Sequence, residues 1–153
     1  RRNGGGKCLN KYTLLMDIRI PKTGVHYSLY NTSATNGNSG DAWINKNGQI
    51  GQGTYSKEKI TVNQWTRVAL TVDIPKERRF FINGSEVLKL PGGKKDGRFS
   101  LGTSTCYHPL VHLFGDSKGE DSDIHVRQVA MYNYPLKKNQ IKKMAGPKTE
   151  ISY

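Results

Sequence analysis

The chain has 153 residues, 35% of them hydrophobic and 24% charged, and its 24 lysines and arginines against 12 acidic residues give a net charge of +12. This composition excludes an intrinsically disordered chain, and no apolar run approaches the ~18 residues that a membrane-spanning helix requires. The length suits one domain, so we expect residues 1–153 to form a single domain. Within it, residues 1–10 are expected to be either the boundary of the domain or a short first strand. The excess of positive charge favours anionic partners or surfaces.

Apolar residues that recur at every second position predict strands along most of the sequence. In residues 11–20 all of them except Leu15 fall on one parity, which predicts a strand with one buried face. The Asn83-Gly84 pair between two β-rich runs predicts a tight hairpin. Trp65 opens the clearest strand, so we expect its ring in the core. The other strands are expected at residues 25–32, 42–51, 66–74, 97–102 and 110–116.

The last third of the chain predicts one more strand and the only helix. In residues 123–134 the inward apolar positions change parity midway, which predicts a β-bulge near Arg127 and Gln128. Residues 134–147 predict a short helix with Pro135 at its first helical position. Many short strands, glycine-rich turns and one terminal helix together predict an antiparallel two-sheet sandwich.

Six segments carry a resemblance to a known family, and they occur in the order typical of that family. They are "YTLLMDIRIP", "GDAWINKNGQIG", "NQWTRVALTVD", "RFFINGSEVL", "DGRFSLG" and "HLFGDSKGEDSDIHVRQVAMYNYPLKKNQI". Over residues 12–145 the chain resembles the laminin-G-like, concanavalin-A-like jelly-roll domains. The family usually has another strand before the first of these segments, and here only "RRNGGGKCLNK" precedes it.

The resemblance implies an all-β fold, a two-sheet antiparallel jelly-roll sandwich with one short C-terminal helix. It also implies a ligand surface at the rim loops or on the concave sheet. Family members bind sugars, sulfated glycans or proteins, some hold calcium, and some relatives are glycosidases. We therefore expect a non-catalytic binding module of a larger protein, which recognises a glycan, an acidic polymer or a protein surface.

Polar and aromatic residues of the expected rim loops are the candidate ligand contacts. Amide and carboxyl groups there could hydrogen-bond a sugar, and an aromatic ring could stack on its face, although such rings more often lie in a core or at a sheet edge. The residues expected to contact the ligand are Asn36, Asn38, Asp41, Trp43 and Tyr55.

Basic residues in two loops offer an alternative function, the binding of a polyanion such as nucleic acid or a sulfated glycan. Such binding weakens as the salt concentration rises. No motif for sequence-specific nucleic-acid recognition is visible, and the lysines of the terminal helix are typical of a solvated face. The residues expected to bind anions are Arg78, Arg79, Lys94, Lys95 and Arg98.

A third of the acidic residues cluster in one loop, at Asp116, Glu120, Asp121 and Asp123. Carboxylates on a loop could hold calcium, the one cofactor that the sequence suggests. The alternatives are a solvated turn whose carboxylates accept local backbone amides, and pairing with basic side chains of the same fold. A glycosidase of the laminarinase type needs a third acid that is absent after Asp123, so we expect no catalytic residues.

The two cysteines, Cys8 and Cys106, leave the cellular compartment open. One bridge between them is compatible with the sequence, but two thiols do not form a disulfide framework. The chain begins at Arg1 without a methionine, so we interpret it as a piece of a larger protein or a mature product.

Overall fold

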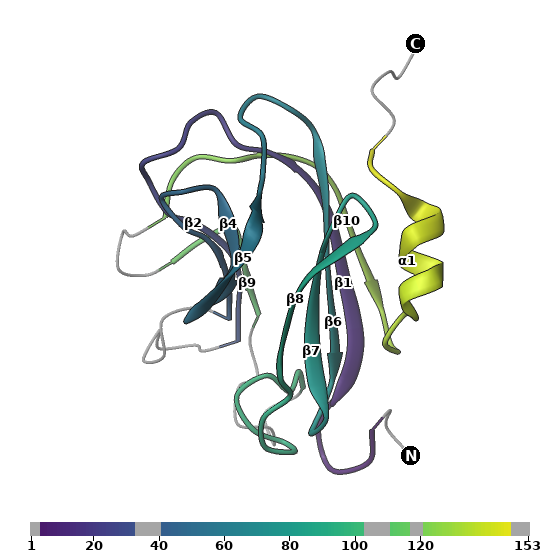
Figure 1. Cartoon of the computed structure of the whole chain (residues 1–153). Helices are drawn as coiled ribbons and strands as arrows, with labels where there is room; N and C mark the ends of the chain where they lie inside the picture. Colours follow the sequence, from purple (N-terminus) through teal and green to yellow (C-terminus); the bar gives the residue numbers. More distant parts are fainter. Residues whose placement is uncertain (1–3, 33–40, 103–110, 117–120, 148–153) are drawn as a thin grey trace.

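The structure, a computed structural model, describes residues 4–32, 41–102, 111–116 and 121–147. In these ranges the chain forms two antiparallel sheets and one short helix (Figure 1). The elements are β1 (Lys11–Arg19), β2 (Tyr27–Asn31), β3 (Ala42–Ile44), β4 (Gln49–Gln52), β5 (Thr54–Lys59), β6 (Thr66–Asp73), β7 (Glu77–Ile82), β8 (Ser85–Pro91), β9 (His112–Leu113), β10 (His125–Tyr132) and α1 (Lys138–Met144). None of the helical segments in these ranges is long and apolar enough to cross a membrane.

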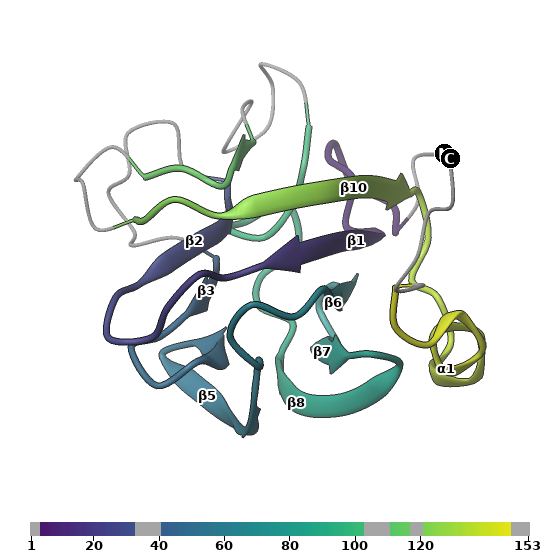
Figure 2. The same cartoon turned by 90° about the horizontal axis from the view of Figure 1, so that it is seen from above.

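Each sheet has five strands, and the two sheets lie face to face as the sequence predicts. The first sheet has the order β10-β1-β6-β7-β8, and the second has the order β5-β4-β3-β2-β9. At one side of the sandwich β5 contacts β8. The edge strands at the other side are β9 and β10, and β10 lies beside β1 in the view from above (Figure 2).

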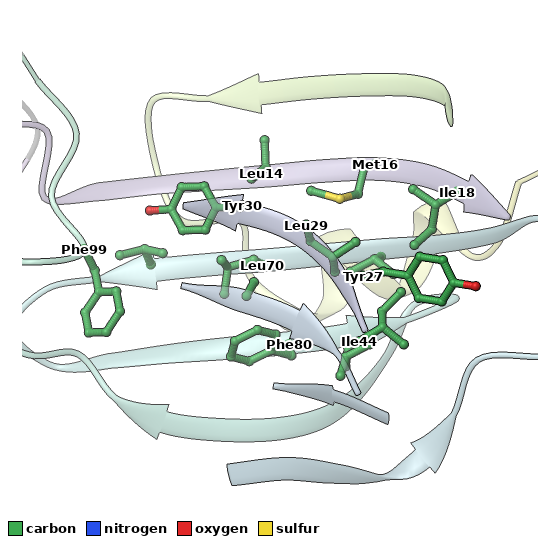
Figure 3. Close-up of a cluster of buried hydrophobic side chains, with 14 of the residues drawn as sticks. Leu14, Met16, Ile18, Tyr27, Leu29, Tyr30, Ile44, Leu70, Phe80 and Phe99 are labelled. Atoms are coloured by element: carbon green, nitrogen blue, oxygen red, sulfur yellow. The ribbon is translucent and has the colours of Figure 1, made fainter. Parts of the chain in front are cut away.

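The main core fills the space between the sheets (Figure 3). Leu14, Met16 and Ile18 project from β1 because alternate residues of a strand face the same side. Leu29 and Ile44 come from the second sheet, and all five side chains are at most 2% exposed. The period-two pattern of the sequence therefore identified the inner face of the first sheet correctly.

The outer face of β1, which the sequence predicts to be polar and exposed, is instead buried. The helix α1 and the segment before it lie against the outer face of the first sheet (Figure 1), where Ala69 of β6 and Phe81 of β7 form a second, smaller core with Leu136 and Ile141. The hydroxyl of Thr13 donates to the carbonyl of Tyr134 at 3.0 Å. The outer face is thus a second packing surface.

Two further elements differ from the sequence-based expectation. The helix begins at Lys138, with Lys137 as its N-cap, so Pro135 precedes it. Residues 97–102 form no strand, and Leu101 makes a single β-bridge with Leu9. The bridge at Leu9 lies outside the named strands, so the described residues before Lys11 form no strand.

The predicted bulge and hairpin are both confirmed. Ile18 pairs with Val126 and Asp17 with Gln128, so Arg127 is the extra residue of β10. Asn83 and Gly84 both have positive φ angles, 48° and 86°, as a two-residue primed turn requires.

Trp65 does not lie in the core, contrary to the sequence-based expectation. It is half-buried at the surface just before β6. The guanidinium carbons of Arg127 and Arg19 lie 5.0 Å and 5.4 Å from its ring centre. The face of an aromatic ring attracts cations. Arg127, the bulge residue, and Arg19 of β1 therefore lie over the indole of Trp65 at the surface.

Candidate functional site

A cleft lies at the side of the sandwich where β9 and β10 are the edge strands. Its volume is about 600 Å³. Its apolar wall consists of Phe114, directly after β9, Ile124, directly before β10, and Val126 within β10. Phe114 and Ile124 are half-buried and pack on the main core. The apolar wall of the cleft is therefore continuous with that core.

The polar wall of the cleft consists of Asp121, Ser122 and Asp123. The same three residues line an adjoining hollow of about 480 Å³ that reaches Pro21 and Lys22. Asp121 and Ser122 are half-buried and Asp123 is exposed. Two acidic residues and one serine therefore line both spaces.

The backbone at Phe114 is held in an unusual conformation. Its φ angle is 57°, in the left-handed region that bulky residues rarely adopt. The amide of Phe114 donates to the carbonyl of Leu29 at 3.3 Å, which ties this residue to β2. Residues held in sparsely populated backbone regions concentrate at binding sites, because the surrounding structure must maintain them.

Exposed apolar side chains gather at the same edge. In the described ranges the large apolar side chains classed as exposed all lie on or beside β9 and β10. They are Val111, Leu113, Val126, Val129, Met131 and Tyr134. Val126, Val129 and Met131 pair with the inward-facing residues Ile18, Met16 and Leu14 of β1. The sequence thus predicted correctly that these side chains lie on the inner face of the first sheet. They are exposed because the second sheet does not cover β10.

The cleft combines features that a binding site for a sugar ring requires. Small-molecule sites are mostly apolar with a few polar groups that fix orientation. An aromatic wall can pack on the C–H face of a sugar, and ionised carboxylates accept hydrogen bonds from hydroxyl groups. The described residues of the cleft supply one aromatic ring, two carboxylates and one hydroxyl.

The ligand residues predicted from the sequence do not gather at this cleft. Asn36 and Asn38 lie outside the described residues. Asp41 is 1% exposed and Trp43 is 7% exposed, with the ring of His26 edge-on to Trp43 at 6.2 Å. Tyr55 is half-buried on β5, at the opposite edge of the second sheet, and burial raises its pKa.

Asp41 belongs to a polar cluster at one end of the interior. Its carboxylate accepts the backbone amide of Thr32 at 2.6 Å and Nε of Arg98 at 2.8 Å. The hydroxyls of Tyr12 and Tyr30 contact each other nearby, and burial raises the pKa of both phenols. This arrangement gives Asp41 a structural role in joining loops to the core.

The five residues predicted to bind anions are divided between two faces. Arg78 points inward, is 5% exposed, and has its guanidinium carbon 3.4 Å from the ring centre of Phe99. Burial lowers the pKa of Arg78 to about 10. Arg98 also lies over Phe99, at 5.3 Å, and the exposed Lys94 and Lys95 share its loop. Arg79 instead lies on the outer face, 2.6 Å from a carboxylate oxygen of Glu77.

Asp96 anchors the N-terminal segment to the basic loop. Its carboxylate accepts Nδ2 of Asn10 at 2.8 Å and the backbone amides of Lys7 and Cys8, both at 3.0 Å. These hydrogen bonds, that of Asn10 first, lower the pKa of Asp96. Cys8 is disulfide-bonded, and the only other cysteine of the chain, Cys106, lies outside the described residues.

This anchor predicts that the N-terminal segment loosens in acid. A carboxylate whose pKa is lower in the folded state stabilises the fold above its unfolded pKa of about 3.9, and the effect is lost as the pH falls through the folded pKa. We expect hydrogen-exchange protection at Lys7 and Cys8 to fall below about pH 4. Asp96→Asn should lower that protection at neutral pH, whereas the exposed Glu58→Gln should not. Unchanged protection in Asp96→Asn would contradict the anchor.

The acidic loop shows no metal site in the described residues. Glu120 lies outside them, and among the rest no three histidine, cysteine or acidic side chains come together. Asp116 follows β9 and is half-buried, whereas Asp121 and Asp123 line the cleft. The calcium site therefore stays a prediction.

Sequence reasoning missed the apolar half of the cleft. Phe114 was interpreted as part of a strand over residues 110–116, but β9 is only His112–Leu113. Ile124 was expected to face the core, and it does so only partly. No local motif distinguishes an aromatic residue that ends a strand from one inside it.

The chain matches a family model, described as the concanavalin A-like lectin/glucanases superfamily, over residues 11–142. It matches no curated protein sequence. Among solved structures it is similar to Trypanosoma rangeli sialidase, with a TM-score of 0.64, 17% identity, and coverage of 88% of this chain and 22% of the sialidase. A candidate carbohydrate binding protein from Bacteroides ovatus has a TM-score of 0.60, 16% identity, and coverage of 90% and 41%.

A native heptameric SAP-like pentraxin from Limulus polyphemus is also similar, with a TM-score of 0.58, 12% identity, and coverage of 89% of this chain and 70% of the pentraxin. At these identities the similarities show a shared fold. The chain spans less than a quarter of the sialidase, which is a much longer protein.

Proposed function

Because the chain belongs to the concanavalin A-like lectin/glucanase superfamily, we propose that it is a non-catalytic carbohydrate-binding module. A sugar ring enters the cleft between β9 and β10 and packs against Phe114. Asp121 and Asp123 accept hydrogen bonds from its hydroxyl groups. The similarity in fold to the Bacteroides ovatus protein supports the ligand class. The single observation that carries the proposal is that one aromatic residue and two acidic residues line the same open cleft.

The first test is a glycan array, followed by titration calorimetry with the strongest ligand. Phe114→Ala should weaken binding about tenfold, because losing an aromatic contact of about 1.4 kcal/mol changes the affinity by that factor. Asp121→Asn should weaken it about tenfold or more, because hydrogen bonds to charged groups contribute about 1.5–3 kcal/mol. Thermal melts must show that both variants remain folded.

The matched control is Tyr55→Ala, which removes a half-buried ring at the opposite edge of the second sheet. We expect this variant to bind as tightly as the unmodified protein. Loss of affinity in Tyr55→Ala with none in Phe114→Ala would move the site to the residues predicted from sequence.

A protein partner is the second candidate, and the apolar strip on β9 and β10 favours it. Contiguous exposed apolar surface often marks a protein-binding site. Val129→Ser and Met131→Ser alter this strip without touching the residues that line the cleft. Glycan binding that is unchanged in these variants separates the cleft from the strip.

A further inference from the structure

A groove of about 390 Å³ lies on the outer face of the first sheet, separate from the Phe114 cleft. Its floor is the outer face of β6 and β7, including Thr71 and Arg79. Its other wall is the segment that leads into α1, from Pro135 to Lys138. Because Leu136 and Ile141 hold this segment and α1 on the sheet, the packing of the small outer core forms the groove.

The two carboxylates that line this groove, Asp73 and Glu77, are already paired with basic side chains. Asp73 contacts Lys11 at 2.8 Å. Glu77 contacts Arg79 at 2.6 Å and Lys89 at 2.8 Å. The hydrogen bond from Lys89 contributes most to a lowered pKa of Glu77, so this carboxylate stays ionised.

A third carboxylate, that of Glu86, forms ion pairs with two lining residues, at 3.3 Å from Arg79 and 3.8 Å from Lys138. Among the charged residues that line the groove and their ion-pair partners, basic side chains outnumber carboxylates by six to three. The six are Lys11, Lys76, Arg79, Lys89, Lys137 and Lys138, and the three are Asp73, Glu77 and Glu86.

Three exposed lysines are among the residues that line the groove. The side chains of Lys76 and Lys138 are 69% and 61% exposed, although Lys76 lies 3.9 Å from Glu77 and Lys138 lies 3.8 Å from Glu86. Lys137, which also lines the groove, is exposed. Along α1, Lys142 and Lys143 are exposed as well. Exposed lysines therefore occur both in the lining of the groove and along the helix.

We infer that this groove and α1 bind a sulfated or carboxylated polysaccharide. Anionic groups of the polymer contact Lys76, Lys137 and Lys138, and binding releases the counterions of the polymer. The described lining contains no aromatic side chain, whereas single-stranded nucleic acids are held largely by bases stacked on aromatic rings. The surface thus favours a polysaccharide over a nucleic acid.

The test measures the binding of a heparin oligosaccharide and of a mixed single-stranded oligonucleotide of equal charge at three salt concentrations. The triple variant Lys76→Gln, Lys137→Gln, Lys138→Gln should lose at least about tenfold in heparin affinity. Its plot of log affinity against log salt should be shallower, because fewer ions are released. The control Lys46→Gln, Lys57→Gln, Lys59→Gln removes the same charge from exposed positions in the second sheet and its β3–β4 turn.

Equal losses in the two triple variants would overturn the site, because net charge alone would then explain binding. Tighter binding of the oligonucleotide than of heparin would overturn the polysaccharide assignment. Phe114→Ala should leave heparin binding unchanged, and its loss there would refute the separation of the two surfaces. The glycan proposal for the cleft is measured with other ligands, so either proposal can fail alone.

Discussion

Replacing Asp17 with alanine is expected to lower the free energy of unfolding by about 3 to 5 kcal/mol. Asp17 is 2% exposed, and its two carboxylate oxygens each accept a hydrogen bond of 2.7 Å, from Nε and Nη2 of Arg67. The hydrogen bonds to Asp17 raise the pKa of Arg67, which remains charged. Removing Asp17 leaves the Arg67 guanidinium, whose side chain is 17% exposed, without its carboxylate partner.

The matched control is Asp73→Ala, which breaks an ion pair between the same two strands. Lys11 and Asp73 pair across β1 and β6 as Asp17 and Arg67 do, but their side chains are 36% and 24% exposed. Such pairs contribute about 0–1 kcal/mol. Chemical denaturation of both variants measures the difference. Equal destabilisation would show that burial does not decide the strength of these pairs.

Phe81→Ala should lower the free energy of unfolding by about 3 to 5 kcal/mol, and should first loosen α1. Phe81 is 1% exposed on the outer face of β7, where it packs with Ala69, Leu136 and Ile141. A helix of seven residues is not stable without such contacts. Hydrogen exchange should show early loss of protection in α1, and heparin binding at the groove should fall with it.

The neighbouring residue provides the comparison. Phe80 is fully buried, but it belongs to the core between the sheets. Phe80→Ala should have a cost of similar size, because a comparable cavity is made. In that variant the amides of α1 should lose protection only with global unfolding. Selective loosening of α1 in both variants would contradict two separate cores.

The sequence predicts what local patterns control. The parity of apolar residues in residues 11–20 identified the inner face of β1, and the change of parity in β10 identified the bulge at Arg127. Asn83 and Gly84 identified the hairpin because few residues tolerate two successive positive φ angles. Each of these signals depends on residues close together in the chain.

Features that depend on distant segments could not be predicted. Thr13 appears as a solvent-facing position until the segment before α1 is placed over it. The strand β5, Thr54–Lys59, has no apolar alternation and exists because β4 pairs with it. The cleft requires the end of β9 and the start of β10 to meet, so neither Phe114 nor Ile124 is identifiable alone.

The bulge in β10 also affects how the chain behaves at high concentration. An edge strand of eight residues with apolar side chains is a template for the strand of another molecule, and such pairing leads to aggregation. The extra residue Arg127 interrupts the regular hydrogen-bonding register of β10 and increases its local twist. The bulge therefore disfavours extension of the sheet by a second molecule along the full length of β10, and with it the edge-to-edge aggregation of this apolar strand.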